Sequence, residues 1–216
     1  MKKLVLMLGI VASVVSVGIS AMSDEEWNRA FDNCADEYTS ACQALIDNGL
    51  QSVEQCTKET CNTIGVIYNN AGYPQIAFLY YEKAVSLGDI LANMNLGIAY
   101  DKKRDFYNAA KHHNIACEKL DTSELEFKAQ SCFNLGVAYN QGKGVRQDYH
   151  KAAELYKKSC DMKFAQACHN LSILYFNGQG VRQNNSTAKE YFGKACDLGI
   201  QDSCDNYKLL NNKGVQ

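Results

Sequence analysis

Part of this chain repeats itself at a fixed distance, and this repetition limits the possible folds more than any other feature of the sequence. Residues 170–181 read NLSILYFNGQGV, and residues 134–145 read NLGVAYNQGKGV. Their leucines, Leu171 and Leu135, are 171 − 135 = 36 residues apart. A period of this length, with small and aromatic residues at matching phases, is typical of stacked helix pairs. We therefore expect an all-α fold, a solenoid of helix-turn-helix repeats.

Counterparts of Leu171 recur along most of the chain. They are spaced by 19, 32, 39, 36 and 36 residues and fall at Leu45, Ile64, Leu96, Leu135, Leu171 and Tyr207. The array is thus regular in its second half and irregular at the start, as expected for the end repeats of a solenoid. The front, including Trp27 to Cys34, reads as a further helix followed by a reduced turn.

Each repeat reads as a first helix, a loop and a second helix, which we call helix A and helix B. Helix A carries a glycine directly after its leucine, as in Leu135-Gly136, where a neighbouring helix must approach closely. The loop contains Gly-x-Gly, which supplies positive φ at the helix end. Asp148 and Asn184 are placed to cap the following helix B.

Helix B carries a pair of large side chains before its cysteine phase. Three pairs are aromatic or aliphatic and one is a histidine pair: Tyr80-Tyr81, His112-His113, Leu155-Tyr156 and Tyr191-Phe192. Adjacent histidines can bind metals. Because these two occupy positions that are apolar or aromatic elsewhere, we expect them to pack between layers, and we expect neither a metal nor a cofactor.

The first 21 residues differ in kind from the rest. Lys2 and Lys3 precede an uncharged run from Leu4 to Ile19, which small residues close. The run is about 16 residues long, short of the roughly 20 that a spanning helix needs. We therefore expect residues 1–21 to be a signal peptide, residues 22–216 to be the solenoid, and the mature protein to be secreted or periplasmic without membrane insertion.

Charge and composition exclude some partners. Without Lys2 and Lys3, 22 − 2 = 20 basic residues face 24 acidic ones, a net charge near −4. Such a balance does not favour nucleic acid or an anionic membrane. A single proline and no low-complexity segment indicate one ordered domain, which we expect to be a monomer.

The ten cysteines suggest local disulfides, because an even number on an exported chain is typical of a disulfide framework. Residues equidistant from the turn of an antiparallel helix pair face one another. The spacing predicts four bonds between a helix B and the next helix A: Cys34 with Cys42, Cys117 with Cys132, Cys160 with Cys168, and Cys196 with Cys204. Cys56 and Cys61 are the two cysteines that remain, and we expect them to form the fifth bond.

One hairpin is longer than the others. Cys117 and Cys132 are 15 apart, against 8 for Cys160 and Cys168, so the connection holds 15 − 8 = 7 extra residues. Seven residues are nearly two helical turns. We expect one extra turn on helix B and one on the following helix A.

These features together resemble a known family. The pattern Ala-x-x-Asn-Leu-x-x-x-Tyr-x-x-Gly-x-Gly-Val resembles the Sel1-like repeat, a relative of the tetratricopeptide repeat. With the eight-spaced cysteines, residues 27–208 are similar to the Helicobacter cysteine-rich protein family, often described as penicillin-binding proteins or β-lactamases. The resemblance implies a right-handed α-solenoid, export, and weak hydrolysis of β-lactams as an alternative function.

The residues for β-lactam chemistry are largely missing. A serine enzyme of the usual kind combines Ser-x-x-Lys, Ser-Asp-Asn and Lys-Thr-Gly. Only Ser186 to Lys189 matches the first motif, and neither of the others occurs. Ser186 also falls in the first turn of a helix B, where serine is favoured for structural reasons. Catalytic residues therefore stay unknown, and the chain is an enzyme only by resemblance.

The inner face of such a solenoid is a stripe along the helices A, and here it is rich in amides. We call this set the amide stripe: Asn95, Gln130, Asn134, Gln141, Gln166, Asn170, Asn177 and Asn206. An amide donates and accepts hydrogen bonds at once, which suits the backbone of an extended peptide. Alternatively, each asparagine tethers the adjacent repeat or a helix end. We expect a scaffold that binds a peptide, protein or peptidoglycan-like ligand there.

Overall fold

The computed structural model describes residues 53 and 55–215, and these residues are helical without any strand. The expected all-α fold of helix hairpins is therefore confirmed for this part of the chain. The predicted helix at Trp27 to Cys34 and the pair Cys34 and Cys42 lie outside the described residues. The chain divides into two compact units, Met1–Leu96 and Gly97–Gln216.

The first unit holds one complete hairpin. Helix A is α4 (Lys58–Asn70), helix B is α5 (Pro74–Ser86), and α6 (Ala92–Lys102) begins in this unit and continues into the second. Their core is a buried cluster of Cys56, Cys61, Ile64, Tyr80, Ala84 and Ala92. Pro74 occupies the first helical position of α5, where its missing N–H costs no hydrogen bond.

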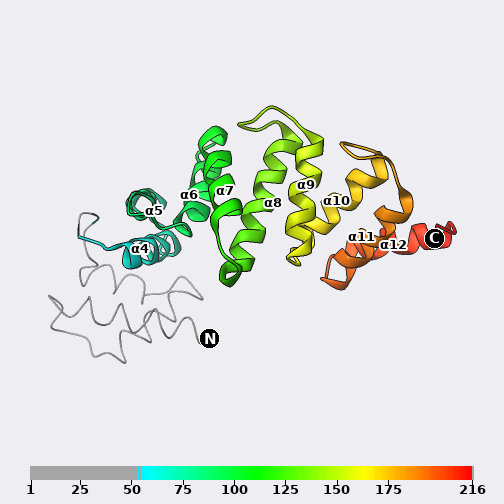
Figure 1. The fold of residues 1–216 in the computed structure, drawn as a ribbon. Helices are drawn as coiled ribbons and strands as arrows, with labels where there is room; N and C mark the ends of the chain where they lie inside the picture. Colours follow the sequence, from blue (N-terminus) through cyan, green and yellow to red (C-terminus); the bar gives the residue numbers. More distant parts are fainter. Residues whose placement is uncertain (1–52, 54, 216) are drawn as a thin grey trace, which may run out of the picture. The chain divides into compact units, whose positions relative to one another are not determined.

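The second unit is a series of hairpins in chain order (Figure 1). After the end of α6 come α7 (Phe106–Lys119), the 3₁₀ helix η1 (Thr122–Glu124), α8 (Leu125–Gln141), α9 (Tyr149–Asp161), α10 (Ala165–Asn177), α11 (Asn185–Asp197) and α12 (Gln201–Asn212). From α7 to α12, each α-helix packs against the next in sequence. Repeats that contact only their neighbours are the defining property of a solenoid.

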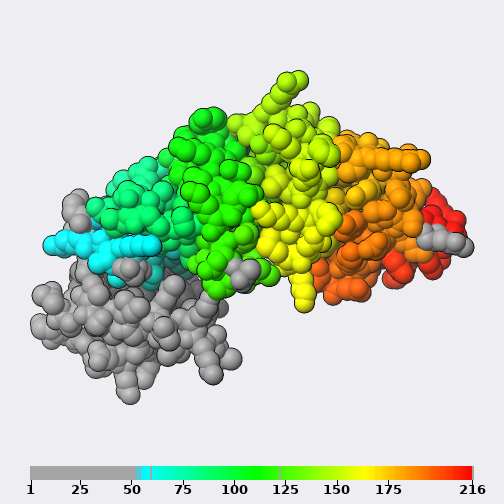
Figure 2. Space-filling model, in the orientation of Figure 1, coloured from blue at the N-terminus to red at the C-terminus, as the bar shows by residue number. Residues whose placement is uncertain are grey.

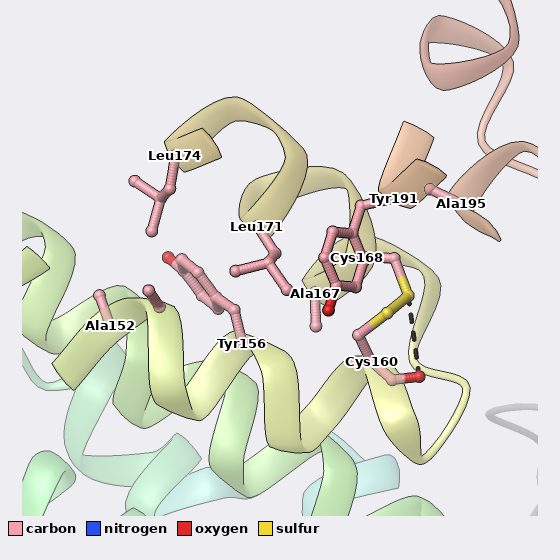
Figure 3. Packing of buried hydrophobic residues seen from close by; sticks show 10 residues of the cluster. Ala152, Tyr156, Cys160, Ala167, Cys168, Leu171, Leu174, Tyr191 and Ala195 are labelled. Carbon is pink, nitrogen blue, oxygen red and sulfur yellow. Dashed lines mark hydrogen bonds between the residues drawn. A yellow bond between two sulfur atoms is a disulfide. The ribbon is translucent and has the colours of Figure 1, made fainter. Parts of the chain in front are cut away.

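The core of the second unit lies between the helix pairs. Figure 3 shows Tyr156 and Cys160 of α9 facing Leu171 and Cys168 of α10, with Tyr191 of α11 beside them. Tyr156 and Leu171 are each 1% exposed. The leucine that defines the repeat is therefore the centre of the packing between successive hairpins, as the periodicity predicts.

The glycine after each repeat leucine allows the close helix contact that the sequence predicts. A β-carbon added at Gly65, Gly97 or Gly136 would lie 2.6, 2.7 or 2.8 Å from the nearest atom of Tyr81, His113 or Tyr156, respectively. Real β-carbons essentially never come that close. The same ring position in helix B thus packs on the backbone of helix A in three repeats.

The Gly-x-Gly loops and the caps also follow the prediction. Gly142 and Gly178 end α8 and α10 with φ of 67° and 70°, in the left-handed region that glycine adopts without strain. Asp148 accepts hydrogen bonds from the backbone N–H groups of His150 and Lys151. Asn184 accepts one from the N–H of Thr187. Both caps are confirmed.

The long hairpin differs from its prediction in one helix. Helix A gains a turn, since α8 has 17 residues against 13 in α10, but helix B gains only one residue, since α7 has 14 against 13 in α9. The extra turn expected on helix B is therefore wrong. Leu120 is buried with an extended backbone, and Asp121 caps the 3₁₀ helix η1, so α7 stops where these two residues begin.

Four of the five expected disulfides lie within the described residues, and all four are present. Cys56 bonds Cys61, Cys117 bonds Cys132, Cys160 bonds Cys168, and Cys196 bonds Cys204. The last three join helix B to the following helix A, with Cα–Cα distances of 4.6 to 4.8 Å. No free cysteine remains in the described part of the chain. Disulfides of this kind are typical of an oxidising compartment.

Candidate functional site

The amide stripe lies on the helices A and is divided between the two units. Asn95 belongs to the first unit, and the other seven members belong to the second. Asn95, Gln130, Asn134, Asn170 and Asn206 are half-buried, whereas Gln141, Gln166 and Asn177 are exposed. Spacings of four and seven residues place the members within each helix on one face.

Two of the half-buried asparagines already have partners. The Asn95 Nδ2 donates to Oδ1 of Asn62 on α4 at 2.8 Å, which joins two successive helices A of the first unit. The Asn206 Nδ2 donates to the Asp202 carbonyl oxygen of its own helix at 2.9 Å. For Asn95 the tethering alternative therefore holds, and for Asn206 the amide is satisfied locally.

Asn134 and Asn170 are the remaining half-buried asparagines of the stripe. Asn134 makes no hydrogen bond with any residue in the described part of the chain. Asn170 lies near Tyr156, whose hydroxyl is buried without a hydrogen bond of good geometry among residues 55–215. Burial raises the pKa of Tyr156 to about 12, and the Asn170 side chain partly opposes this shift.

Removing the Tyr156 hydroxyl tests this arrangement. Below pH 10 we expect Tyr156→Phe to change the free energy of unfolding by less than about 0.5 kcal/mol, because a buried hydroxyl without a partner contributes little. Above pH 10 the unfolded chain releases the tyrosine proton, whereas the folded chain holds it until about pH 12. Between pH 10 and about pH 12, the free energy of unfolding of the wild type should therefore fall by up to about 1.4 kcal/mol per pH unit. The variant should not show this loss.

Urea unfolding of both proteins between pH 7 and pH 12 measures this difference. A loss of more than about 1 kcal/mol at pH 7 in the variant would show that the hydroxyl is bonded, most simply to Asn170.

The histidine pair packs as the sequence predicts. His112 stacks on Tyr100 with ring centroids 5.5 Å apart, as Tyr191 stacks on Tyr175 at 5.7 Å. His113 is 1% exposed, and its Nε2 lies 2.9 Å from an Asp101 carboxylate oxygen. Burial is the main cause that lowers the pKa of His112. Within the described residues, no cluster of three or more His, Cys, Asp or Glu could hold a metal ion.

The structure does not assemble a serine–lysine pair at the start of α11. Ser186 is exposed, in the first turn of this helix. The Lys189 Nζ instead donates to the Val215 carbonyl oxygen at 2.5 Å and lies 5.7 Å from the centroid of the Tyr207 ring. A lysine that must deprotonate a serine has to reach its hydroxyl. No observation here favours β-lactam hydrolysis.

An open pocket of the second unit lies away from the amide stripe. It is lined by the loop between α10 and α11, by the first residue of α11 and by two earlier residues. The lining residues are His150, Tyr175, Gly180, Val181, Arg182, Gln183, Asn184 and Asn185. None of these is a member of the amide stripe. This region is not among the sites predicted from the sequence, although the repeated Gly-Val-Arg-Gln sequence of residues 144–147 and 180–183 marks it.

The fold and the stripe define an α-helical repeat protein. Residues 71–89, 129–164 and 165–200 match the family described as the Sel1 repeat, so the chain carries Sel1 repeats. It is 35% identical over 88 residues to protein sel-1 homolog 2 of Rattus norvegicus. That alignment covers 39% of this chain and 12% of the relative.

Solved structures show the same fold. The protein c5321, a protective antigen present in uropathogenic Escherichia coli strains, superposes with a TM-score of 0.66 and 24% identity, over 80% of this chain and 37% of that one. A Sel1 repeat protein from Oxalobacter formigenes superposes with a TM-score of 0.65 and 22% identity, over 83% of this chain and 71% of that one. The Sel1-like resemblance is therefore confirmed, whereas these matches do not support the name β-lactamase.

The combined findings support a scaffold for contacts between proteins. Sel1 repeats generally mediate such contacts, and solenoids offer extended binding surfaces on their stacked helices. None of the helices within residues 55–215 has the length and apolar character of a membrane span.

Proposed function

We propose that this protein is an exported repeat scaffold that binds an extended peptide segment along the helices A of its second unit. The observation that carries the proposal is the state of Asn134, a half-buried amide on α8 that has no hydrogen bond with the described residues. A side-chain amide in this state can donate to a peptide carbonyl and accept from a peptide N–H. Such pairing is how extended peptides gain affinity.

Asn170 extends the proposed site by one repeat. It occupies the position of Asn134 in the next helix A, 170 − 134 = 36 residues later. Gln130 and Gln166 precede these asparagines by one helical turn and repeat the same chemistry. The two helices thus offer matching amide pairs to one ligand backbone.

Export agrees with the chemistry of the cysteines. Four disulfides need an oxidising compartment to persist, and residues 1–21 have the composition of a leader that is removed on export. The ligand is then a peptide or cell-wall peptide that is present in the periplasm or outside the cell.

Alanine variants test the peptide site. A peptide ligand is first selected from a random display library against the oxidised protein, and its affinity is then measured by calorimetry. Asn134→Ala and Asn170→Ala should each weaken binding by roughly 1 to 3 kcal/mol, because a peptide group is left unpaired. The double variant should lose more than either one.

The control is Asn114→Ala, which removes an exposed amide from helix α7. It should bind the peptide like the wild type. The melting temperature is measured for every variant. If Asn134→Ala and Asn170→Ala lower the melting temperature while affinity per folded molecule stays the same, these amides tether repeats and the proposal fails.

A further inference from the structure

Three exposed arginines occupy the three loops that join helix A to helix B in the second unit. Arg104 precedes α7, Arg146 precedes α9 and Arg182 precedes α11. None of them makes a hydrogen bond or ion pair with any residue that the structure describes. Arg146 and Arg182 each stand two residues before a helix cap, and Arg104 stands directly before one. All three guanidinium groups are therefore available to a partner.

The second and third loops each pack against the start of the preceding helix B. Gly144 of the second loop packs on the backbone of Phe106, at the start of α7. Gly180 of the third loop packs in the same way on Tyr149, at the start of α9, and its carbonyl oxygen lies 3.2 Å from the His150 Nδ1. The loops consequently form one continuous strip, which we call the loop edge. In Figure 1 the connections α8–α9 and α10–α11 lie on one side of this unit, and the turns α7–α8, α9–α10 and α11–α12 lie on the other.

The loops that carry Arg146 and Arg182 are braced from within. The Gln147 Nε2 donates to the Asn140 carbonyl oxygen at 2.8 Å, and the Gln183 Nε2 donates to the Phe176 carbonyl oxygen at the same distance. Figure 2 shows the α8–α9 connection projecting from the surface. A projecting loop with a fixed backbone loses little conformational entropy when a partner binds, which favours recognition.

The loop edge carries more basic than acidic residues, and its acidic residues are engaged within the chain. The Asp105 and Asp148 carboxylates accept hydrogen bonds from the first-turn N–H groups of α7 and α9. Glu154 lies 3.4 Å from His150. In the third loop the cap is the neutral Asn184, and here the open pocket is lined by Arg182 and His150. Lys143 and Lys151 add two more positive charges.

From this geometry we infer that the loop edge binds an acidic peptide segment of a partner protein, with Arg104, Arg146 and Arg182 each pairing with a carboxylate. A guanidinium group fits a carboxylate with two parallel hydrogen bonds. The arginines follow one another along successive repeats, so an extended chain with spaced carboxylates matches them. The whole chain has a net charge of −2, which disfavours a long polyanion such as nucleic acid.

Fluorescence anisotropy with a fluorescein-labelled octaglutamate peptide tests the inference on the full oxidised chain. The triple variant Arg104→Gln, Arg146→Gln and Arg182→Gln should weaken binding by at least about tenfold, since three charge-assisted contacts are lost. Binding by the wild type should also weaken as salt rises from about 50 to 300 mM, because the contacts are exposed.

A charge-matched control separates the loop edge from net charge. Lys119→Gln, Lys163→Gln and Lys194→Gln remove the same number of positive charges from exposed positions near the turns α7–α8, α9–α10 and α11–α12, on the other side of the unit. This control should bind octaglutamate within about twofold of the wild type. An equal loss in both triple variants, or no binding by the wild type, overturns the inference. The inference is also overturned if the wild type binds duplex DNA or phosphatidylserine vesicles more tightly than octaglutamate and the arginine triple variant loses that binding.

Discussion

Replacing Gly180 with alanine is expected to destabilise the second unit by roughly 2 to 5 kcal/mol. Two costs add at this position. The backbone has φ of +69°, where an L-residue with a side chain costs roughly 1 to 2 kcal/mol. The new β-carbon would also overlap the backbone of Tyr149, which cannot move without displacing α9, and such overpacking costs roughly 1 to 3 kcal/mol. Urea unfolding followed by circular dichroism measures the loss.

Gly214→Ala is the matched control. Gly214 has φ of +72°, but a β-carbon there would meet nothing within 4 Å among the described residues. This variant should therefore lose only the backbone cost of about 1 to 2 kcal/mol. The difference between the two variants isolates the contact between one repeat and the next. Equal losses would mean that the loop yields to the extra carbon and that Gly180 is required for its φ alone.

The contact at Gly180 shows where reasoning from this sequence stops. Gly-x-Gly predicts a helix end with positive φ, and Gly178 fulfils that role at the end of α10. The role of the second glycine depends on the backbone of the preceding repeat, and no local pattern encodes that distance. Contacts within a hairpin are easier to predict, because equal spacing from a turn places two residues opposite each other. Three of the disulfides follow from that rule alone.

The error in the long hairpin had a signal in the sequence. Asp121 stands three residues before Glu124, and an Asp, Ser or Thr followed by Glu at this spacing is typical of a helix start. Counting residues suggested that the extra length would divide evenly between α7 and α8. The cap at Asp121 outweighs this count, since a helix that begins there forces the previous one to end near Leu120.

The amide stripe illustrates a different limit. Repeat spacing places Asn95, Asn134, Asn170 and Asn206 at equivalent positions, so the sequence treats them alike. Their surroundings separate them: Asn95 bonds the neighbouring helix through Asn62, and Asn206 bonds its own helix. Whether an amide is free depends on the side chains that happen to lie within 3 Å or so, which is tertiary information.

Removing the disulfide between Cys117 and Cys132 is the second change with a large expected effect. The double variant Cys117→Ala and Cys132→Ala should lose roughly 3 kcal/mol, because the bond closes a 15-residue loop and so restricts the unfolded chain. Both cysteines are 0% exposed, so lost packing adds to this cost. The fold should persist, since the following hairpins keep the disulfides Cys160–Cys168 and Cys196–Cys204.

The double variant Cys196→Ala and Cys204→Ala provides the comparison. It removes a half-buried disulfide whose cysteines are 8 residues apart. Its removal should cost roughly 2.5 kcal/mol by the same loop argument, with less packing to lose. Calorimetric unfolding of both double variants measures which of them loses more stability. A smaller loss at Cys117 and Cys132 would mean that the added turn of α8 and the η1 segment already hold the long hairpin closed, and that the disulfide there adds little to its stability.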